Sequence, residues 1–107
     1  MKLFFFFFYF CSAQFLRSCE SGDLDKVKSA LEELRKEEGG DVNVKDDSGN
    51  CGLFNAASKG HMPIVEFLLS EGADINATNE NKETALFEAS YQGHFDVCQY
   101  LVSKDVT

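Results

Sequence analysis

Residues 60–76 read Gly-His-Met-Pro-Ile-Val-Glu-Phe-Leu-Leu-Ser-Glu-Gly-Ala-Asp-Ile-Asn. This stretch contains the start and stop signals of a helix. Gly60 favours the left-handed conformation that ends a preceding helix, and Pro63 suits a first helical turn, where its missing N–H would be unpaired anyway. The apolar residues that follow Pro63 provide a broad apolar face, and Gly72 closes the segment. The stretch therefore predicts one helix with defined ends.

The pattern of this stretch recurs later in the chain. Gly93-His94 follows Gly60-His61 at an offset of 33 residues. The same offset relates three further pairs of residues: Leu53 and Leu86, Ala56 and Ala89, and Val65 and Cys98. A fixed period of this length indicates a repeat architecture.

The residues that carry the period closely resemble the ankyrin repeat. The matching positions are Asp41-Val42-Asn43-Val44-Lys45-Asp46 with Gly49, Leu53 with Ala56-Ala57, Gly60-His61, and the residues from Ile64 to Ala77. The resemblance covers roughly Phe15 to Val102, as one divergent repeat and two clearer ones. It implies an all-α repeat solenoid, in which each repeat has two antiparallel helices and a hairpin loop projects between neighbouring repeats.

The register of the repeats divides the chain into four segments. Residues 1–13 are a Phe-rich N-terminal segment, 14–44 a divergent repeat, 45–77 a second repeat, and 78–107 a third repeat that is incomplete at its end. Gly39 follows Gly22 by 17 residues, whereas Gly72 follows Gly60 by 12, and we expect the five extra residues to lengthen the second helix of the first repeat into Glu37-Glu38. No polar capping repeat follows the last apolar face, so a fragment of a longer array and a complete small protein both stay open.

The N-terminal segment has an unusual composition. Leu3 to Phe10 are eight apolar residues, six of them Phe. This run is too short to span a bilayer as a helix, which needs about 20 residues. Lys2, the apolar run and Cys11-Ser12-Ala13 resemble a minimal secretory signal. The alternatives are an apolar cap on the first repeat, or low-complexity sequence that belongs to no fold.

The helix starts differ from one repeat to the next. In the first repeat, Asp23 is expected to cap the second helix through its carboxylate. The second repeat has Cys51-Gly52-Leu53-Phe54 where the ankyrin pattern has Thr-Pro-Leu-His, so it loses a capping bond worth about 1 kcal/mol. The third repeat keeps Thr84. Both repeats have Phe in place of the His of the pattern, at Phe54 and Phe87, so we expect the hydrogen-bond network between repeats to differ from that of the family.

Composition and charge argue against several function classes. A length of 107 residues indicates one small domain, and the net charge of −8 disfavours binding to nucleic acid or to anionic membranes.

The four cysteines show no Cys-x-x-Cys spacing, and Cys19 and Cys98 are interpreted as reduced core residues. His61 and His94 are interpreted as residues that help start second helices. We find no nucleophile with a base, no phosphate-binding loop and no metal cluster, so we expect no enzyme activity, cofactor or small-molecule substrate.

The resemblance implies a protein-protein interaction module, an adaptor or scaffold that binds a partner protein through a concave surface of hairpin tips and first helices. The residues assigned to this surface are those left polar once the apolar helix faces are assigned to the core. They are Lys45, Asp46, Asp47, Asn50, Asn55, Ser58, Lys59, Asn79, Glu80, Asn81, Glu83, Glu88, Tyr91 and Gln92. Among them, Tyr91 is the expected interface anchor.

Other roles follow from weaker signals. The setting of Asn76 resembles that of hairpin asparagines that an oxygenase hydroxylates in ankyrin repeats. Alternative functions are a targeting array of a larger enzyme, whose catalytic domain lies beyond Thr107, and an exported effector directed by the Phe-rich start. We expect a cytoplasmic protein, and contact with a membrane or secretion only through Leu3 to Phe10.

Overall fold

The structure is a computed structural model of the 107-residue chain, and it describes residues 2–37 and 39–105, with side chains from Phe8 onward. Within these residues the chain forms six helices. They are α1 (Lys2–Ser21), α2 (Leu24–Arg35), α3 (Gly52–Lys59), α4 (Met62–Ser70), α5 (Ala85–Gln92) and α6 (Phe95–Lys104). The described residues contain no strand, and a single isolated bridge joins Lys45 and Cys51.

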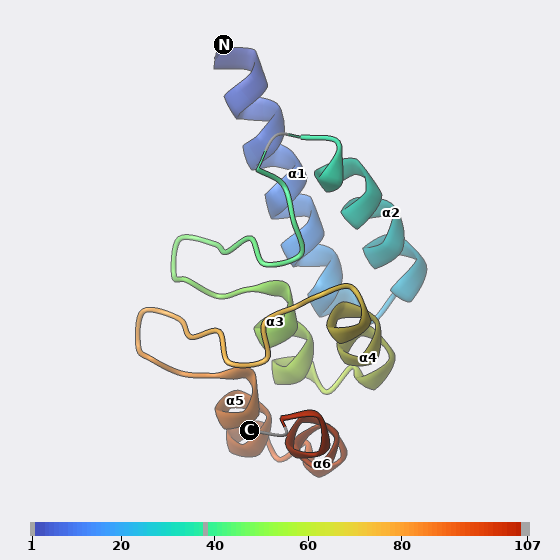
Figure 1. Cartoon of the computed structure of the whole chain (residues 1–107), viewed down its shortest axis with the longest axis vertical. Helices are drawn as coiled ribbons and strands as arrows, with labels where there is room; N and C mark the ends of the chain where they lie inside the picture. Colours follow the sequence, from blue (N-terminus) through green and yellow to red (C-terminus); the bar gives the residue numbers. More distant parts are fainter. Residues whose placement is uncertain (1, 38, 106–107) are drawn as a thin grey trace.

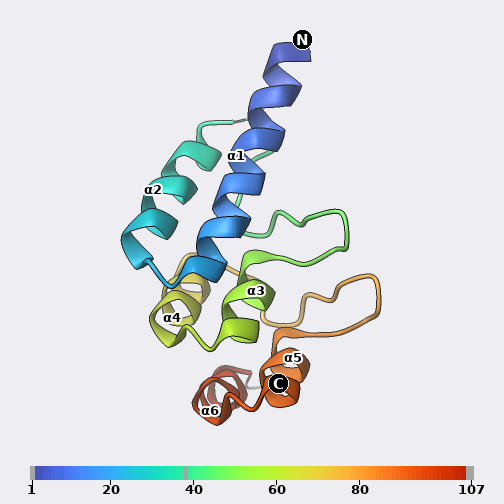
Figure 2. The ribbon, with the colours of Figure 1, turned by 180° about the vertical axis from the view of Figure 1, so that it is seen from behind.

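The helices form three pairs that stack along the long axis of the molecule (Figure 1). α3 packs between α1 and α5, so these three helices make a continuous layer, and α2, α4 and α6 lie beside it. The loops before α3 and before α5 project to the same side of the stack, as the view from behind also shows (Figure 2). The expected all-α solenoid of helix pairs and hairpins is confirmed.

The helix ends agree with the signals in the sequence. Gly60 and Gly93 adopt φ angles of 73° and 83° and end α3 and α5, and their N–H groups bond back to carbonyls of the last turn. Pro63 lies in the first turn of α4, where its lack of an N–H leaves no helical hydrogen bond unmade. Asp23 caps α2, because its carboxylate accepts a hydrogen bond from the Lys26 N–H at 3.2 Å.

The core runs through all three helix pairs without interruption. Its largest fully buried side chains come from every pair and from positions at helical spacing. They are Phe15, Leu31, Leu34, Leu53, Ile64, Leu68 and Leu101. Because no pair could cover its apolar face alone, neighbouring pairs stabilise one another, as in other repeat proteins.

The N-terminal segment is part of the first helix. α1 is continuous for 20 residues from Lys2 and ends at Ser21, and Gly22 directly after it has a φ of 83°. The boundary drawn at residue 13 falls inside this helix. Phe8 packs partly against the core, while Tyr9 and Phe10 are exposed. No helix of the described residues combines the length and the apolar character that crossing a membrane requires.

The additional residues of the first repeat do not lengthen its second helix. α2 ends at Arg35, and the chain turns through Lys36 and Glu37, so the expected extension into Glu37 is wrong; Glu38 lies outside the described residues. The reason is the close return of the backbone. A Cβ at Gly40 would overlap the carbonyl of Leu34, and the Gly40 N–H donates to the Glu37 carbonyl at 3.0 Å. Glycine at this position lets the chain fold back over the helix end.

Candidate protein-binding surface

Each hairpin is organised by one side chain near its start. The Asp46 carboxylate accepts hydrogen bonds from the backbone N–H groups of Ser48 and Asn50, both at 2.9 Å. In the second hairpin, the amide oxygen of Asn79 accepts the N–H groups of Asn81 and Glu83 at 2.9 and 3.0 Å. The two side chains lie 33 residues apart and perform the same task. Their first role is therefore to hold the hairpin tips in shape.

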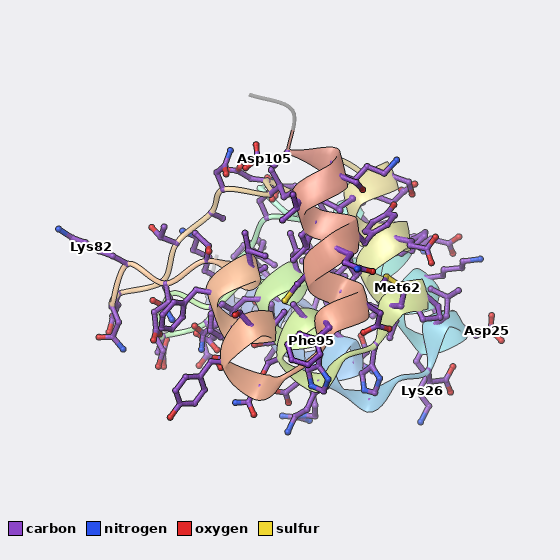
Figure 3. All side chains as sticks on the ribbon, turned by 90° about the horizontal axis from the view of Figure 1, so that it is seen from below. Asp25, Lys26, Met62, Lys82, Phe95 and Asp105 are labelled. Atoms are coloured by element: carbon purple, nitrogen blue, oxygen red, sulfur yellow. The ribbon has the colours of Figure 1, made fainter. Side chains whose placement is uncertain are left out.

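The two hairpins differ at the residue that reverses the chain. Gly49 has a φ of 80°, and a Cβ there would lie 3.0 Å from the backbone nitrogen of Glu80. Lys82, the equivalent residue 33 positions later, keeps the same left-handed conformation at a φ of 62°. Glycine is needed at the first tip because the second hairpin packs directly against it. At the second tip, Lys82 points away from the stack, as Figure 3 shows.

Hydrogen bonds join the hairpins to each other. The Asn79 side-chain amide donates to the Asn50 side-chain oxygen, and the Lys45 ammonium donates to the Thr78 carbonyl, both at 2.9 Å. The Glu80 N–H also donates to the Ser48 carbonyl at 3.1 Å. Because backbone and side-chain bonds both connect them, the tips form one surface rather than two independent loops.

The residues assigned to binding from the sequence lie on the two hairpins, on α3 and on α5, with different accessibility. The exposed residues are Lys45, Asp46, Asp47, Lys59, Glu80, Asn81, Tyr91 and Gln92. The half-buried residues are Asn50, Ser58, Asn79, Glu83 and Glu88. Asp46, Asn50, Asn79 and Glu83 use their side chains for bonds within or between the hairpins. Asp47, Lys59, Glu80 and Asn81 have side chains for which the described residues provide no hydrogen bond or ion pair.

Asn55 does not lie at an open surface. Its side chain is 8% exposed, and its amide donates to the Leu16 carbonyl of α1 at 3.5 Å. The reason is the position of α3 between α1 and α5, which buries every residue from Gly52 to Ala57. The assignment of Asn55 to the partner surface is therefore wrong, and within α3 only Ser58 and Lys59 are accessible.

Tyr91 is the most exposed of the large hydrophobic side chains that the structure describes. It is 77% exposed, and its ring stacks on Phe87 with centroids 6.3 Å apart and an interplanar angle of 18°. Phe87 is 51% exposed, whereas its equivalent Phe54 is 7% exposed, because α5 covers Phe54 and no described helix covers Phe87 in the same way. Phe95, labelled at the start of α6 in Figure 3, is exposed at the same end of the stack.

Comparison with known proteins agrees with this geometry. A family model described as ankyrin repeats, in three copies, matches residues 15–107. The chain belongs to the ankyrin repeat family. A chain in the solved structure of the predatory endopeptidase Bd0816 from Bdellovibrio bacteriovorus, in complex with the immunity protein Bd3460, is 34% identical to this ankyrin protein, with a TM-score of 0.78. The alignment covers 88% of this chain and 47% of that one, so this chain spans about half the length of its structural neighbour. A search of curated proteins found no match.

The two histidines of these ankyrin repeats connect one repeat to the next. The His61 Nε2 lies 3.0 Å from the Glu20 carbonyl oxygen, and the His94 Nε2 lies 3.0 Å from that of Ser58. A carbonyl only accepts, so Nε2 donates in both bonds. Each ring also rests against the glycine that ends the first helix of the preceding repeat. Within the described residues, no group of three His, Cys, Asp or Glu side chains is placed to hold a metal ion.

The four thiols of the ankyrin chain are unpaired. Cys19 is fully buried, and burial raises its pKa to about 12, with smaller contributions from Cys51 and Glu20. This burial confirms the interpretation of Cys19 as a core residue. Cys98 is only half-buried against the core.

Asn76, the suggested hydroxylation site, is exposed in the loop before the second hairpin, and its N–H donates to the Asp74 carboxylate at 3.0 Å.

Reasoning from the sequence alone missed the contribution of α1 to this surface. Phe8 and Tyr9 line a groove beside the first hairpin, whereas the sequence leaves three alternatives open for residues 1–13: a signal, an apolar cap on the first repeat, or low-complexity sequence. A signal was available. No glycine or proline interrupts the sequence between Lys2 and Ser21, which favours one continuous helix.

Proposed function

We propose that this ankyrin protein is a non-catalytic interaction module that binds a partner protein through its coupled hairpin tips and the exposed end of α5. The observation that carries the proposal is the bonding between the hairpins, which fixes their backbones while leaving several side chains unpaired. A surface that is already ordered loses little conformational entropy on binding, so more of the contact energy is retained as affinity. Ankyrin repeats are generally protein-protein interaction modules and typically non-catalytic.

Tyr91 is the best placed anchor for such a partner. Tyrosine provides a large apolar ring and a hydroxyl group at low entropic cost, and tyrosines are enriched among residues that dominate binding energy. Glu88, one helical turn before Gln92, accepts a hydrogen bond from its amide at 3.2 Å and lies half-buried at the edge of the same surface. Neither side chain reaches into the core.

The replacements Tyr91→Ala and Glu88→Ala test this assignment. Because both side chains lie outside the core, we expect the free energy of unfolding to change by less than about 1 kcal/mol. Loss of the anchor should weaken partner binding at least tenfold. The measurement is capture of partners from the native cell on immobilised protein, quantified by mass spectrometry and followed by titration calorimetry with each purified candidate.

The matched control changes two exposed residues on the opposite layer of helices, Glu66→Ala in α4 and Gln99→Ala in α6. A partner that is lost with the Tyr91 and Glu88 variant and retained with the control supports the proposed surface. Equal loss in both variants, or a large stability change without any effect on partners, contradicts it.

A second candidate function follows from the structural neighbour. At 34% identity, the neighbour belongs to a complex of an endopeptidase with an immunity protein, so the partner proposed for this chain is an endopeptidase that it holds inactive. The test is to titrate the purified chain into an endopeptidase of the native cell and measure peptide cleavage. Inhibition at stoichiometric amounts, lost in the Tyr91 and Glu88 variant, supports this candidate. Unchanged cleavage by every endopeptidase that the chain captures contradicts it.

The proposed location is the cytoplasm. Four unpaired thiols fit a reducing compartment, where disulfides rarely form. The intact mass of the protein isolated from its own cell tests this assignment. A mass lower by about the first dozen residues would indicate export with removal of a signal, and would contradict a cytoplasmic location.

A further inference from the structure

A groove lies between α1 and the first hairpin, on the side of the molecule to which the hairpin tips project. Figures 1 and 2 both show the chain after α2 passing beside α1 before it turns out into the hairpin. Phe8, Tyr9 and Leu16 line the groove from α1, and Lys45, Asp46 and Asp47 line it from the hairpin. Its volume is about 290 Å³. The groove exists because α1 continues toward the N-terminus beyond the part that packs on α3.

The floor of the groove is apolar. Leu16 is buried, Phe8 is half-buried, and Tyr9 remains 60% exposed with its ring available for contact. Ser12, which also lines the groove, is 9% exposed, and its hydroxyl donates to the Tyr9 carbonyl at 3.0 Å. Because that hydroxyl is already bonded, the floor offers apolar and aromatic contact rather than an unsatisfied polar group.

The rim of the groove carries a free negative charge. The Asp46 carboxylate is held by two backbone N–H groups of the hairpin, and the Lys45 ammonium is turned toward the Thr78 carbonyl at 2.9 Å. Asp47 is exposed, and the described residues provide no ion pair or hydrogen bond for its carboxylate. Two carboxylates against one ammonium leave the rim negative, in agreement with the net charge of −8 for the whole chain.

We propose that this groove binds a cationic segment of the partner protein that carries a large apolar side chain. The apolar side chain would lie on Phe8 and Tyr9, and an adjacent lysine or arginine would pair with Asp47 and contact the face of the Tyr9 ring. Pockets for small molecules have volumes of roughly 300 to 1,000 Å³, so this groove is sized for one or two side chains of a polypeptide. The inference rests on the proposed function and specifies the chemistry of the partner.

Two synthetic peptides test the proposal with the full chain. One is an eight-residue peptide in which lysines alternate with leucines and phenylalanines, and the other has glutamate in place of each lysine. Calorimetric titration should show at least tenfold tighter binding of the lysine peptide, because it alone complements the charge of the rim. Amide resonances of Ser12 and Asp47 should shift on binding.

Matched variants locate the binding site. Tyr9→Ala and Asp47→Lys should each weaken binding of the lysine peptide at least fivefold. Phe10→Ala removes a neighbouring exposed aromatic that does not line the groove, and Glu32→Lys makes the same charge change on α2; both should leave affinity within twofold of the native chain. Asp47→Asn, which removes only the charge, replaces Asp47→Lys if the latter alters the melting temperature.

Equal affinity for the two peptides, or equal losses in the variants and their controls, overturns the groove assignment. A natural partner that depends on Tyr91 but not on Tyr9 or Asp47 also overturns it, while leaving the interaction module intact. Conversely, the native chain could bind the lysine peptide selectively while the Tyr91 and Glu88 variant loses no partner. That outcome supports the groove and contradicts the proposed surface at α5.

Discussion

At the scale of single residues, the link between repeats is a histidine that packs on a glycine. A Cβ at Gly22 would lie 2.9 Å from the ring of His61, and a Cβ at Gly60 would lie 2.6 Å from the ring of His94. Gly93 has the same left-handed backbone, but apart from its chain neighbours and its own helix no atom of the described residues lies within 4 Å of where its Cβ would be. The glycine at the end of a first helix therefore has two separable roles: it adopts the left-handed conformation, and it leaves room for the histidine ring of the next repeat. Of the three glycines, Gly93 has the first role alone.

This difference gives a comparison of two equivalent alanine replacements. Gly93→Ala should cost about 1 kcal/mol of stability, the strain of a left-handed alanine. Gly60→Ala should cost about 1 kcal/mol more, because the His94 ring is displaced and its bond to the Ser58 carbonyl is lost. Urea unfolding measures both values. In a double-mutant cycle, His94→Ala should remove the additional cost of Gly60→Ala; equal effects of the two glycine replacements would contradict the packing role of Gly60.

At the scale of elements, α3 and α5 are equivalent helices with different N-termini. The Thr84 hydroxyl caps α5 by accepting the Phe87 N–H at 3.1 Å, whereas Cys51 makes no side-chain cap for α3. α3 is nevertheless the most buried helix of the described chain, since α1, α4 and α5 all pack on it. Tertiary contacts thus compensate for a missing local signal, as is usual for short helices in proteins.

Exchange of the two capping residues tests this view of α3. Cys51→Thr should raise the free energy of unfolding by about 1 kcal/mol, because the new hydroxyl accepts a backbone N–H of the first turn. Thr84→Cys should lower it by a similar amount. Cys51→Val has the shape of threonine without the oxygen, and it should give no such gain. If the valine variant is stabilised as much as the threonine variant, packing rather than capping explains the effect.

At the scale of the whole molecule, one core connects the repeats, and Cys19 lies inside it. Its side chain faces the start of α3, where a Cβ on Gly52 would come within 2.9 Å of the sulfur. Burial raises the Cys19 pKa from 9.0 to about 12, so the thiol stays protonated in the folded chain at pH values where it ionises in the unfolded chain.

This shift predicts a loss of stability in alkali. Below pH 9 the thiol is protonated in both states and has no effect, whereas between pH 9 and about 12 only the unfolded state releases the proton, so stability falls as pH rises. The loss should approach about 1 kcal/mol for each pH unit well above 9. Urea unfolding from pH 8 to 10.5 should show a shallower decline for Cys19→Ala than for the native chain. Parallel declines would mean that Cys19 does not ionise on unfolding.

Much of the fold could be predicted from particular residues. Gly60, Pro63 and Asp23 mark helix ends through local backbone chemistry, and each marks the same end in the structure. The end of α2 could not be predicted in this way, because the charged residues after Arg35 are good helix formers, and the backbone return at Gly40 is a tertiary contact. The burial of Asn55 could not be predicted either, since a polar residue in a helix does not indicate that a neighbouring helix covers it.

Patterns in the amino-acid sequence are sufficient to predict the family, the period of the repeats and the positions of most helix ends. These depend on interactions within a few residues of the chain, namely helix periodicity, capping and the backbone preferences of glycine and proline. Which polar side chains are exposed depends on the tertiary structure, and so does the position of Phe8 and Tyr9 in α1, where they line the groove at the first hairpin. Both depend on contacts between residues far apart in the chain, which local sequence patterns do not encode.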